Sequence, residues 1–506
     1  TGKKFMMMIR GRIPGGVMTS QQYITFDDLA TEYGNNTLRL TTRQSIQFHG
    51  VLLHGLGPLI KKINESLLST LAACGDVNRN ITASPTPAYT KARELVYQDS
   101  VRVADALNPQ TKAYHSIWID GQQLNLEDEE NINFVDPLYG KTYLPRKFKI
   151  SFVTPPSNDM DVFTNDLGYI AITDGDELLG YNVTIGGGMG RSHNQQATFP
   201  RLADVVGFIP ADKAVAIAKA ALTIHRDHGD RSNRKHARLK YVVAEKGLEW
   251  IRAELERRAE ITIEDARPYE FTSTGDLYGW HRAVDGKLFL TSYVEMGRIK
   301  DNEGRAQKTA FRQVAEQFPH VEFRLSANQN VIIANVPESD RSGITDLLAT
   351  HGVRVDNQAS ILHSASMACP SLPTCGLGLA ESERMLPALI DRIEKLGGEL
   401  GLGGEEIIIR STGCPNGCAR PYMAEMAFVG KAPGRYQFWL GGNASGTRLN
   451  RVYKEVIKEA EIEAELTPLF KRYKAERTEG ERFGDFAARV FWPEQDTDAA
   501  AEAANN

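Results

Sequence analysis

The sequence predicts an α+β protein made of two diverged halves, because one strand–helix–strand unit occurs twice. Residues 39–51 and 324–336 each begin with Arg-Leu-Thr or Arg-Leu-Ser, pass through a Gln and end in an apolar strand. A Gly-Arg-Ile triplet lies upstream of each segment, and helical patterns at 23–33 and 306–317 lie between. The recurrence of the same elements in the same order indicates an internal repeat.

A second pair of segments supports the same division. Residues 181–191 (YNVTIGGGMGR) and 436–448 (YQFWLGGNASGTR) are each an alternating strand that runs into a Gly-rich turn. We interpret both pairs as halves related by a pseudo-twofold axis, and a chance similarity of strand–turn patterns is the alternative. The halves differ in their basic residues, with Arg10, Arg43 and His49 in the first against Met296, Asn328 and an apolar stretch in the second.

The remaining elements follow from shorter patterns. Residues 211–222 and 383–396 have the spacing of amphipathic helices, and the polar segment 128–143 predicts a loop. The Gly-rich turns resemble phosphate loops only loosely, because no Lys-Ser/Thr pair follows them. The last residues, 491–506, predict a flexible tail.

Length and composition limit the class of protein. A chain of 506 residues predicts about three domains. The 42% hydrophobic and 24% charged residues are typical of a globular protein, and the net charge of -5 disfavours a protein that coats nucleic acid. No apolar run approaches the roughly 18 residues of a membrane span. We expect a cytoplasmic protein, or a plastid-stromal one in a eukaryote, and interpret the start without Met as truncated or processed.

Four of the five cysteines are grouped, and this grouping indicates a metal centre. Cys369 and Cys375 are separated by five residues, and Cys414 and Cys418 by three. Zinc knuckles use shorter or different spacings, whereas an iron–sulfur cube accepts wider ones. Zinc and unligated thiols stay as alternatives at this point. The fifth, Cys74, reads by itself as a small buried residue.

Several basic residues lie in otherwise apolar or turn-rich segments. Arg10 follows a run of three Met and an Ile, and Arg79 lies between two Asn. Lys147 and Lys149 are two apart on a strand, so both point to one face and repel each other unless an anion lies between them. The alternative is that both lysines face water.

A second basic group occupies residues 231–240. On a helix, four of its members would share one face: Arg231, Arg234, Lys235 and Arg238. A solvated face, nucleic acid and a polycarboxylate cofactor are the alternatives for this group.

These residues together resemble the sirohaem- and [4Fe–4S]-containing sulfite and nitrite reductases. The resemblance begins with Cys369-Pro-Ser-Leu-Pro-Thr-Cys375 and Thr412-Gly-Cys414-Pro-Asn-Gly-Cys418. It extends over nearly the whole chain, from about residue 10 to about residue 486. The other matching motifs are Arg10-Gly-Arg-Ile-Pro-Gly-Gly16, Arg39-Leu-Thr-Thr-Arg-Gln44, Gln47-Phe-His49, Asn78-Arg-Asn80, Tyr143-Leu-Pro-Arg-Lys-Phe-Lys149, Gly186-Gly-Gly188, Asn328-Gln-Asn330 and Gly430-Lys-Ala-Pro-Gly-Arg-Tyr436.

The resemblance implies a three-lobed fold with a pseudo-twofold repeat around a central sirohaem. A ferredoxin-like lobe would combine 1–72 with 281–356, a sirohaem and substrate lobe would cover 73–280, and a cluster lobe would cover 357–490. The cluster would be held by Cys369, Cys375, Cys414 and Cys418, with Cys418 also axial to the sirohaem iron. The sirohaem carboxylates would be bound by Arg39, Thr42, Arg43, Gln47, His49, Arg191, Arg238, Lys240 and Asn416.

The implied reaction is the six-electron reduction of sulfite to sulfide in assimilatory sulfur metabolism and cysteine biosynthesis. Arg10, Arg79, Lys147 and Lys149 would bind the anion and deliver protons. Ferredoxin-dependent nitrite reduction is the first alternative, and the second lysine, Lys149, favours sulfite. A nucleic-acid-binding protein and a zinc structural protein are more distant alternatives.

Two further expectations concern the electron donor and the residues Cys74 and Gly75. Electrons would come from a ferredoxin or a flavoprotein subunit, and the stretch 186–193 with Cys418-Ala-Arg-Pro-Tyr422 favours ferredoxin. Cys74 would be a modifiable thiol near the substrate. Gly75 replaces the Asn of some relatives, which puts a side-chain role at this position in doubt.

Overall fold

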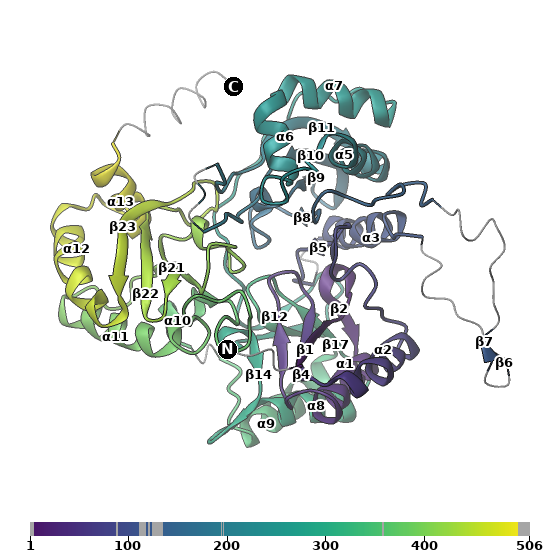
Figure 1. The fold of residues 1–506 in the computed structure, drawn as a ribbon. Helices are drawn as coiled ribbons and strands as arrows, with labels where there is room; N and C mark the ends of the chain where they lie inside the picture. The colour runs from purple at the N-terminus through teal and green to yellow at the C-terminus, as the bar shows by residue number, and fades with distance from the viewer. Residues whose placement is uncertain are drawn as a thin grey trace.

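The computed structural model describes residues 5–87, 90–110, 118–119, 122–123, 135–193, 195, 197–356 and 359–493. Three groups of sheets and helices meet near the middle of the molecule (Figure 1). The first combines the purple amino-terminal segments with green-teal segments of the second half, the second is formed by the blue and teal segments between them, and the third by the green and yellow segments. The mixed α+β architecture is therefore confirmed.

The first group contains a four-stranded and a five-stranded sheet, and one strand of each sheet comes from the other half of the repeat. One sheet has the order β1-β4-β3-β14 and the other β12-β13-β18-β17-β2. Strand β2 pairs with β17, and β14 pairs with β3. The strands are β1 (Met7–Arg10), β2 (Val17–Thr19), β3 (Leu38–Leu40), β4 (Ile46–Val51), β12 (Gly279–Arg282), β13 (Leu288–Ser292), β14 (Arg298–Ile299), β17 (Glu322–Leu325) and β18 (Val331–Val336).

The helices of this group confirm two of the predicted patterns. Helix α1 (Ser20–Glu32) begins with a capping box, in which the Thr19 side chain and the Gln22 side chain satisfy each other's backbone N–H groups. Helix α8 (Gln307–Gln317) takes the equivalent place in the second half. The outer helices are α2 (Leu56–Glu65) and α9 (Arg341–Thr350).

The repeat is correct, but one of its predicted correspondences is wrong. Arg12 precedes the 3-10 helix η1 (Pro14–Gly16), whereas Arg298 follows the 3-10 helix η5 (Glu295–Gly297) and opens β14. The two Gly-Arg-Ile triplets therefore hold different places in their units. The turns after β3 and β17 do correspond, since Gln44 and Gln329 both have a left-handed φ, of 49° and 71°.

The second and third groups each contain one five-stranded sheet with the same topology. The orders are β11-β10-β9-β8-β5 and β23-β22-β21-β20-β19, with parallel pairing at one end and antiparallel pairing at the other. The strands of the first are β5 (Thr82–Ala83), β8 (Ile150–Val153), β9 (Leu167–Asp174), β10 (Glu177–Ile185) and β11 (Asp204–Pro210). Those of the second are β19 (Met367–Ala368), β20 (Ile409–Thr412), β21 (Met426–Ala432), β22 (Arg435–Leu440) and β23 (Arg451–Lys458).

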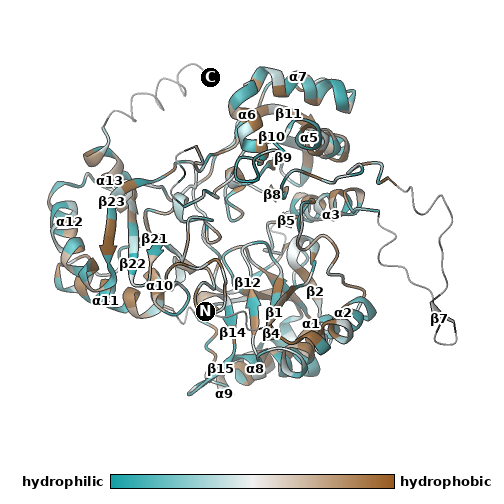
Figure 2. Ribbon diagram, viewed as in Figure 1, coloured by the Kyte–Doolittle hydropathy of each residue, from teal (hydrophilic) through white to brown (hydrophobic). Residues whose placement is uncertain are grey.

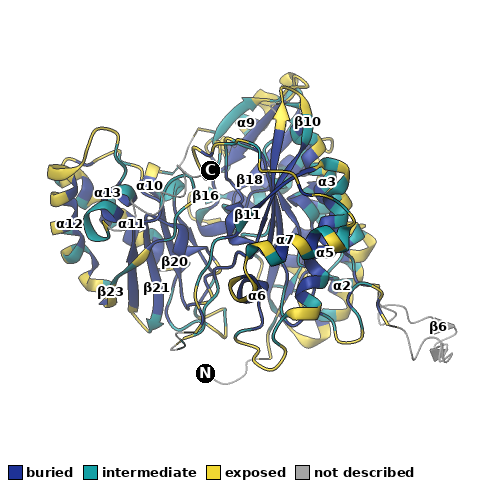
Figure 3. Cartoon of the chain, turned by 90° about the horizontal axis from the view of Figure 1, so that it is seen from above, coloured by how far each residue is buried: buried dark blue, intermediate teal, exposed yellow. Residues whose placement is uncertain are grey.

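Helices cover these two sheets with apolar faces. In α11 (Leu386–Glu399), Leu386, Leu389, Ile390 and Ile393 are buried at the spacing of one helix face. The helices carry both hydrophobic and hydrophilic residues (Figure 2), and the sheets are mostly buried while exposed residues gather on the helices and loops around them (Figure 3). The other helices are α3 (Lys91–Ala106), α5 (Ala214–His228), α6 (Leu239–Lys246), α7 (Leu248–Ala259), α10 (Ile361–Ser364), α12 (Ile462–Glu476) and α13 (Phe483–Phe491).

Three large hydrophobic cores follow the three groups. One joins residues from 9–63 with residues from 288–353, a second lies within 72–263, and a third lies mainly within 362–487. The division into 1–72 with 281–356, 73–280 and 357–490 stays a proposal about domain boundaries.

The basic residues 231–238 do not share a helix face, as they would if this segment were helical. The segment 229–238 forms turns, and α6 begins only at Leu239. Arg231 instead donates to the Tyr143 carbonyl, and Arg234 pairs with Asp76 at 2.7 Å. Part of the predicted loop 128–143 and most of the predicted tail 491–506 lie outside the described residues. In the described residues, no helix has the length and apolar character needed to cross a membrane.

Candidate active site

The four grouped cysteines lie at the carboxyl ends of two neighbouring strands. Cys369 follows β19, and Cys414 lies two residues after β20. These strands are parallel, so their carboxyl ends meet at one edge of the sheet, where ligands commonly bind in such folds. Cys418 lies further along the loop after β20, and Cys375 in the loop after β19. All four thiols are free in the structure.

The pKa shifts of the thiols show that these side chains lie close together, because each shift is caused partly by another cysteine. Burial raises the pKa of Cys369 to about 12 and that of Cys414 to about 11, and the nearby Cys418 raises both further. Cys375 acts in the same direction on Cys414. The Gly413 backbone N–H donates to the Cys369 Sγ at 3.4 Å, the type of contact that stabilises a thiolate ligand. Four converging thiols with an N–H donor fit an iron–sulfur cluster.

The four basic residues predicted to bind the substrate form a connected group of neighbouring cations. Arg10 and Arg79 both donate to the Ala73 carbonyl at 3.3 Å, so their guanidinium groups are neighbours. Arg79 and Lys147 each lower the pKa of a basic neighbour by repulsion: Arg79 that of Lys147, and Lys147 that of Lys149. The Cys418 thiol acts in the opposite sense on both lysines.

The two lysines are the electrostatically unusual members of this group. Burial, Arg238 and other cations lower the pKa of Lys147 to about 8. Burial and the charges of Lys147 and Arg43 lower the pKa of Lys149 well below its ordinary value. Within the described part of the chain, neither ammonium group has a hydrogen bond or an ion pair. Such a group of cations without counterions favours an anionic ligand.

The predicted carboxylate ligands of sirohaem divide into accessible and enclosed side chains. Arg39 and Lys240 have no exposed surface, so a bound group cannot touch them. Arg39 pairs with Glu383 at 3.0 Å and donates to the Ala368 carbonyl. Lys240 donates to three backbone carbonyls, those of Gly188, Gly190 and Phe199.

Three further predicted ligands use their charge or polarity inside the protein. Arg238 is 8% exposed and pairs with the buried Asp166 at 2.8 Å. Arg43 is more accessible, but it donates to the carbonyls of Asn80 and Ile150. Burial and the cations around it lower the pKa of His49 to about 3, so this ring is neutral at pH 7 and offers no positive charge.

Thr42, Arg191 and Asn416 lie beside the loop that carries Cys414 and Cys418, and Gln47 lies further away. Thr42 donates to the Cys418 carbonyl at 3.1 Å, and the Arg191 backbone N–H donates to the Pro415 carbonyl at 3.0 Å. The Arg191 Nε is buried without a partner among the described residues. Asn416 is exposed beside Cys414. Gln47 lies between His49 and Arg10, with its amide oxygen placed to accept from Arg10.

The predictions for Cys74 and Gly75 have different outcomes. Cys74 is exposed rather than buried and lies close enough to Arg79 to raise the pKa of that guanidinium. Gly75 accepts a hydrogen bond from Arg79 Nε at 2.7 Å through its carbonyl, so this position acts through the backbone. Modification of Cys74 stays a prediction.

Sequence reasoning missed the acidic residues that organise these cations. Three carboxylates form ion pairs with these arginines. Glu383 pairs with Arg39 and Arg298, and Asp166 pairs with Arg238. Asp161 pairs with Arg410 and Arg420. Asp166 and Asp161 are buried, which is rare for carboxylates unless they are paired. Their only sequence signal is an acidic residue inside a segment that is otherwise apolar or turn-rich.

Comparisons with known proteins agree with this arrangement. A family model described as "Nitrite/Sulfite reductase ferredoxin-like half domain" matches residues 1–66 and 281–351, and one described as "Nitrite and sulphite reductase 4Fe-4S domain" matches residues 98–263. The "Sulfite reductase [NADPH] hemoprotein beta-component" of Myxococcus xanthus is 48% identical over 96% of this chain and 85% of its own length. The protein of the same name from Anoxybacillus flavithermus is 48% identical over 98% and 86%.

A solved structure supports the fold. The Mycobacterium tuberculosis NirA protein matches 96% of this chain and 84% of its own, with a TM-score of 0.76 and 21% identity. This chain belongs to the nitrite and sulfite reductase family. The range 98–263 that matches the 4Fe-4S model contains no cysteine, so the grouped thiols come from the other half of the repeat.

Proposed function

We propose that this protein reduces sulfite to sulfide, with six electrons, in assimilatory sulfur metabolism. The observation that carries the proposal is the pair Lys147 and Lys149, which lack partners in the described chain and lie near the Cys418 thiol. A substrate with two negative charges would satisfy both ammonium groups. The names of the relatives, sulfite reductase hemoproteins, point to the same substrate.

The residues that would hold the redox groups follow from the site. Cys369, Cys375, Cys414 and Cys418 would ligate a [4Fe–4S] cluster, and Cys418 would also hold the sirohaem. When bound, these groups would carry electrons from a partner to the substrate. The sirohaem carboxylates would be bound by Thr42, Arg43, Gln47, Arg191, Arg238 and Asn416, and the fully enclosed Arg39 and Lys240 and the neutral His49 would act behind them.

The chain's own basic residues would then bind and protonate the substrate. Arg10 and Arg79 would orient the anion through hydrogen bonds from their guanidinium groups. Lys147, with its pKa near 8, is suited to donate a proton to an oxygen that leaves as water. Burial and the neighbouring cations lower the pKa of Lys149, and the negative charge of a bound anion would favour its ammonium form.

The proposed partner is a flavoprotein that delivers electrons from NADPH. The relatives are named as the beta-component of an NADPH enzyme, which favours a flavoprotein over the ferredoxin expected from the sequence. We place the reaction in the cytoplasm.

The proposal is tested by an absorption spectrum and by turnover with two substrates. The purified, metal-replete protein should show a sirohaem band that sulfite shifts, and kcat/KM for sulfite should exceed that for nitrite. Lys149→Asn should reduce the preference for sulfite, and Lys213→Arg, at an exposed site, serves as the control. A folded, metal-replete sample without the band, or a preference for nitrite, would contradict the proposal.

A further inference from the structure

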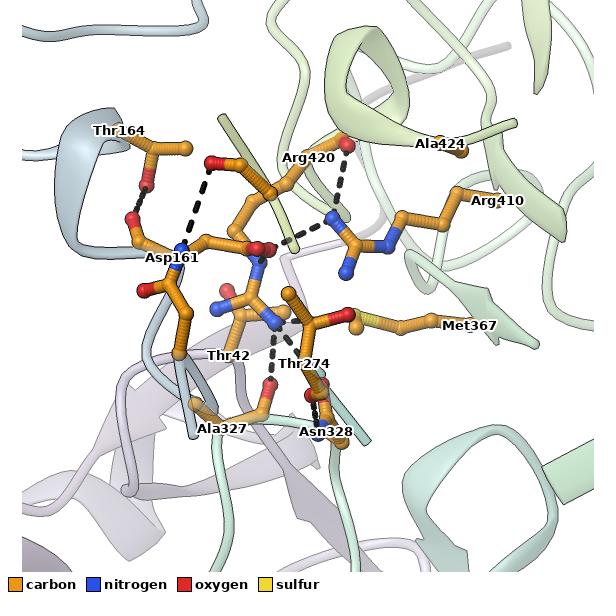
Figure 4. Close-up of polar contacts among 12 residues, drawn as sticks. Thr42, Asp161, Thr164, Thr274, Ala327, Asn328, Met367, Arg410, Arg420 and Ala424 are labelled. Atoms are coloured by element: carbon orange, nitrogen blue, oxygen red, sulfur yellow. Dashed lines mark hydrogen bonds and ion pairs between the residues drawn. The ribbon is translucent and has the colours of Figure 1, made fainter. Parts of the chain in front are cut away.

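Asp161 and Arg420 form a buried ion pair at the place where the three groups of sheets meet (Figure 4). Their side chains are 1% and 7% exposed, and Arg420 Nε lies 2.8 Å from Asp161 Oδ2. Arg410 donates to the same oxygen at 2.6 Å. Arg420 also donates to the Ala327 carbonyl and to Asn328 Oδ1, both at 3.1 Å. The ion pair joins a loop of the second group to a loop of the third, and the hydrogen bonds of Arg420 join both to a loop of the first group.

The two partners hold equivalent positions in the repeat. Ile150 of β8 faces Leu167 of β9, just as Ile409 of β20 faces Met426 of β21. The segments between these strands have the same length, and this match without a gap places Asp161 opposite Arg420.

The local backbone agrees with this correspondence. Asp161 and Arg420 directly precede the short 3-10 helices η3 (Val162–Thr164) and η7 (Pro421–Met423), with left-handed φ values of 44° and 53°. The pair is thus formed by two copies of one position that carry opposite charges.

Arg420 belongs to the loop that carries Cys418. Its backbone N–H donates to the Gly417 carbonyl at 3.0 Å, and Thr42 donates to the Cys418 carbonyl. A left-handed φ at a non-glycine residue is unfavourable and persists only when its surroundings impose it. The contacts of the Arg420 guanidinium with Asp161, Ala327 and Asn328 supply that constraint.

We infer that Asp161, through its ion pair with Arg420, is a positioning residue that fixes the Cys418 loop. The inference rests on the proposed function, because it gives this loop a role in holding the redox centre. Without the carboxylate, Arg410 and Arg420 would be two buried cations facing each other, and the loop would lose its fixed end.

The test compares Asp161→Asn with a matched buried ion pair elsewhere. Asp27 is 2% exposed and pairs with Lys308 and Arg312 at 2.9 and 3.0 Å, in the sheets of the first group. In the holoenzyme, Asp161→Asn should alter the visible spectrum and raise the midpoint potential, because added positive charge favours the reduced centre. Arg420→Lys, which keeps the charge, should give a smaller change. Asp27→Asn should lower only the melting temperature.

Each outcome bears on one of the two proposals. A wild-type protein without a sirohaem band contradicts the proposed function. A loaded Asp161→Asn protein with the wild-type spectrum and midpoint potential overturns the positioning role. Should the variants not fold, amide hydrogen exchange of the unmodified holoenzyme decides, since segments 158–165 and 414–424 must then open at one common rate. Different rates for the two segments overturn the inference.

Discussion

Lys147 gives a sharp prediction about the dependence of turnover on pH. Its pKa is lowered to about 8 by burial and by the neighbouring cations, with Arg238 the largest of these. A lysine donates a proton only in its charged form, so the donor is present below pH 8 and lost as the pH rises through 8. The charged fraction falls from about 90% at pH 7 to about 10% at pH 9 for a group with this pKa.

The expected result is a fall in kcat/KM of about tenfold between pH 7 and pH 9. Because kcat/KM reports the free enzyme and kcat the substrate complex, the bound anion should move the falling limb of kcat to higher pH. The assay is steady-state sulfite reduction with an artificial electron donor over pH 6 to 10.

The variant Lys147→Arg separates proton donation from charge. Arginine does not titrate in this range, so the limb near pH 8 should vanish, and loss of the proton donor should lower kcat/KM by about 10²-fold. Lys213→Arg, at an exposed position, should leave both values unchanged. A Lys147→Arg enzyme that keeps a falling limb at the wild-type midpoint would refute the assignment.

Three other changes test separate parts of the structure. Cys418→Ser should abolish the coupled sirohaem spectrum while the chain stays folded by circular dichroism; an unchanged spectrum would contradict the ligand assignment. Bound sulfite should favour the ammonium form of Lys149, so the buffer dependence of the calorimetric binding enthalpy should differ between the wild type and Lys149→Met; an identical dependence would contradict this role. Asp27→Asn should lower the free energy of unfolding by about 1–3 kcal/mol, measured by urea denaturation, because it leaves the buried Lys308 without its carboxylate.

The repeat was readable from the sequence because both copies kept the residues of a tight turn. Gln44 and Gln329 have side chains that donate into the backbone of neighbouring segments, so each copy needs the same residue. The exchange of β2 and β14 between sheets was not readable, because a triplet such as Gly-Arg-Ile does not record which side of a 3-10 helix it occupies.

The site residues could be predicted from the sequence where a residue type serves mainly one chemical role, as grouped cysteines do in binding metals. Grouped cysteines indicate a metal centre wherever the chain places them, and the structure brings all four together. The roles of arginines were harder to predict, because an arginine can serve a ligand or a distant carboxylate equally well. Arg39 forms a buried ion pair with Glu383, which lies far away in the sequence, and no local sequence pattern predicts such a pair.

The strand exchange in the first group of sheets has a consequence for synthesis on the ribosome. Strands β1 to β4 emerge early, yet their sheet is completed by β14 and their own β2 needs β17. At about 5–20 residues per second, the nascent amino-terminal segment waits roughly 10–50 s for these partners. Its apolar strands stay open to chaperones for that time, so translation speed and chaperone supply should govern the yield of folded enzyme.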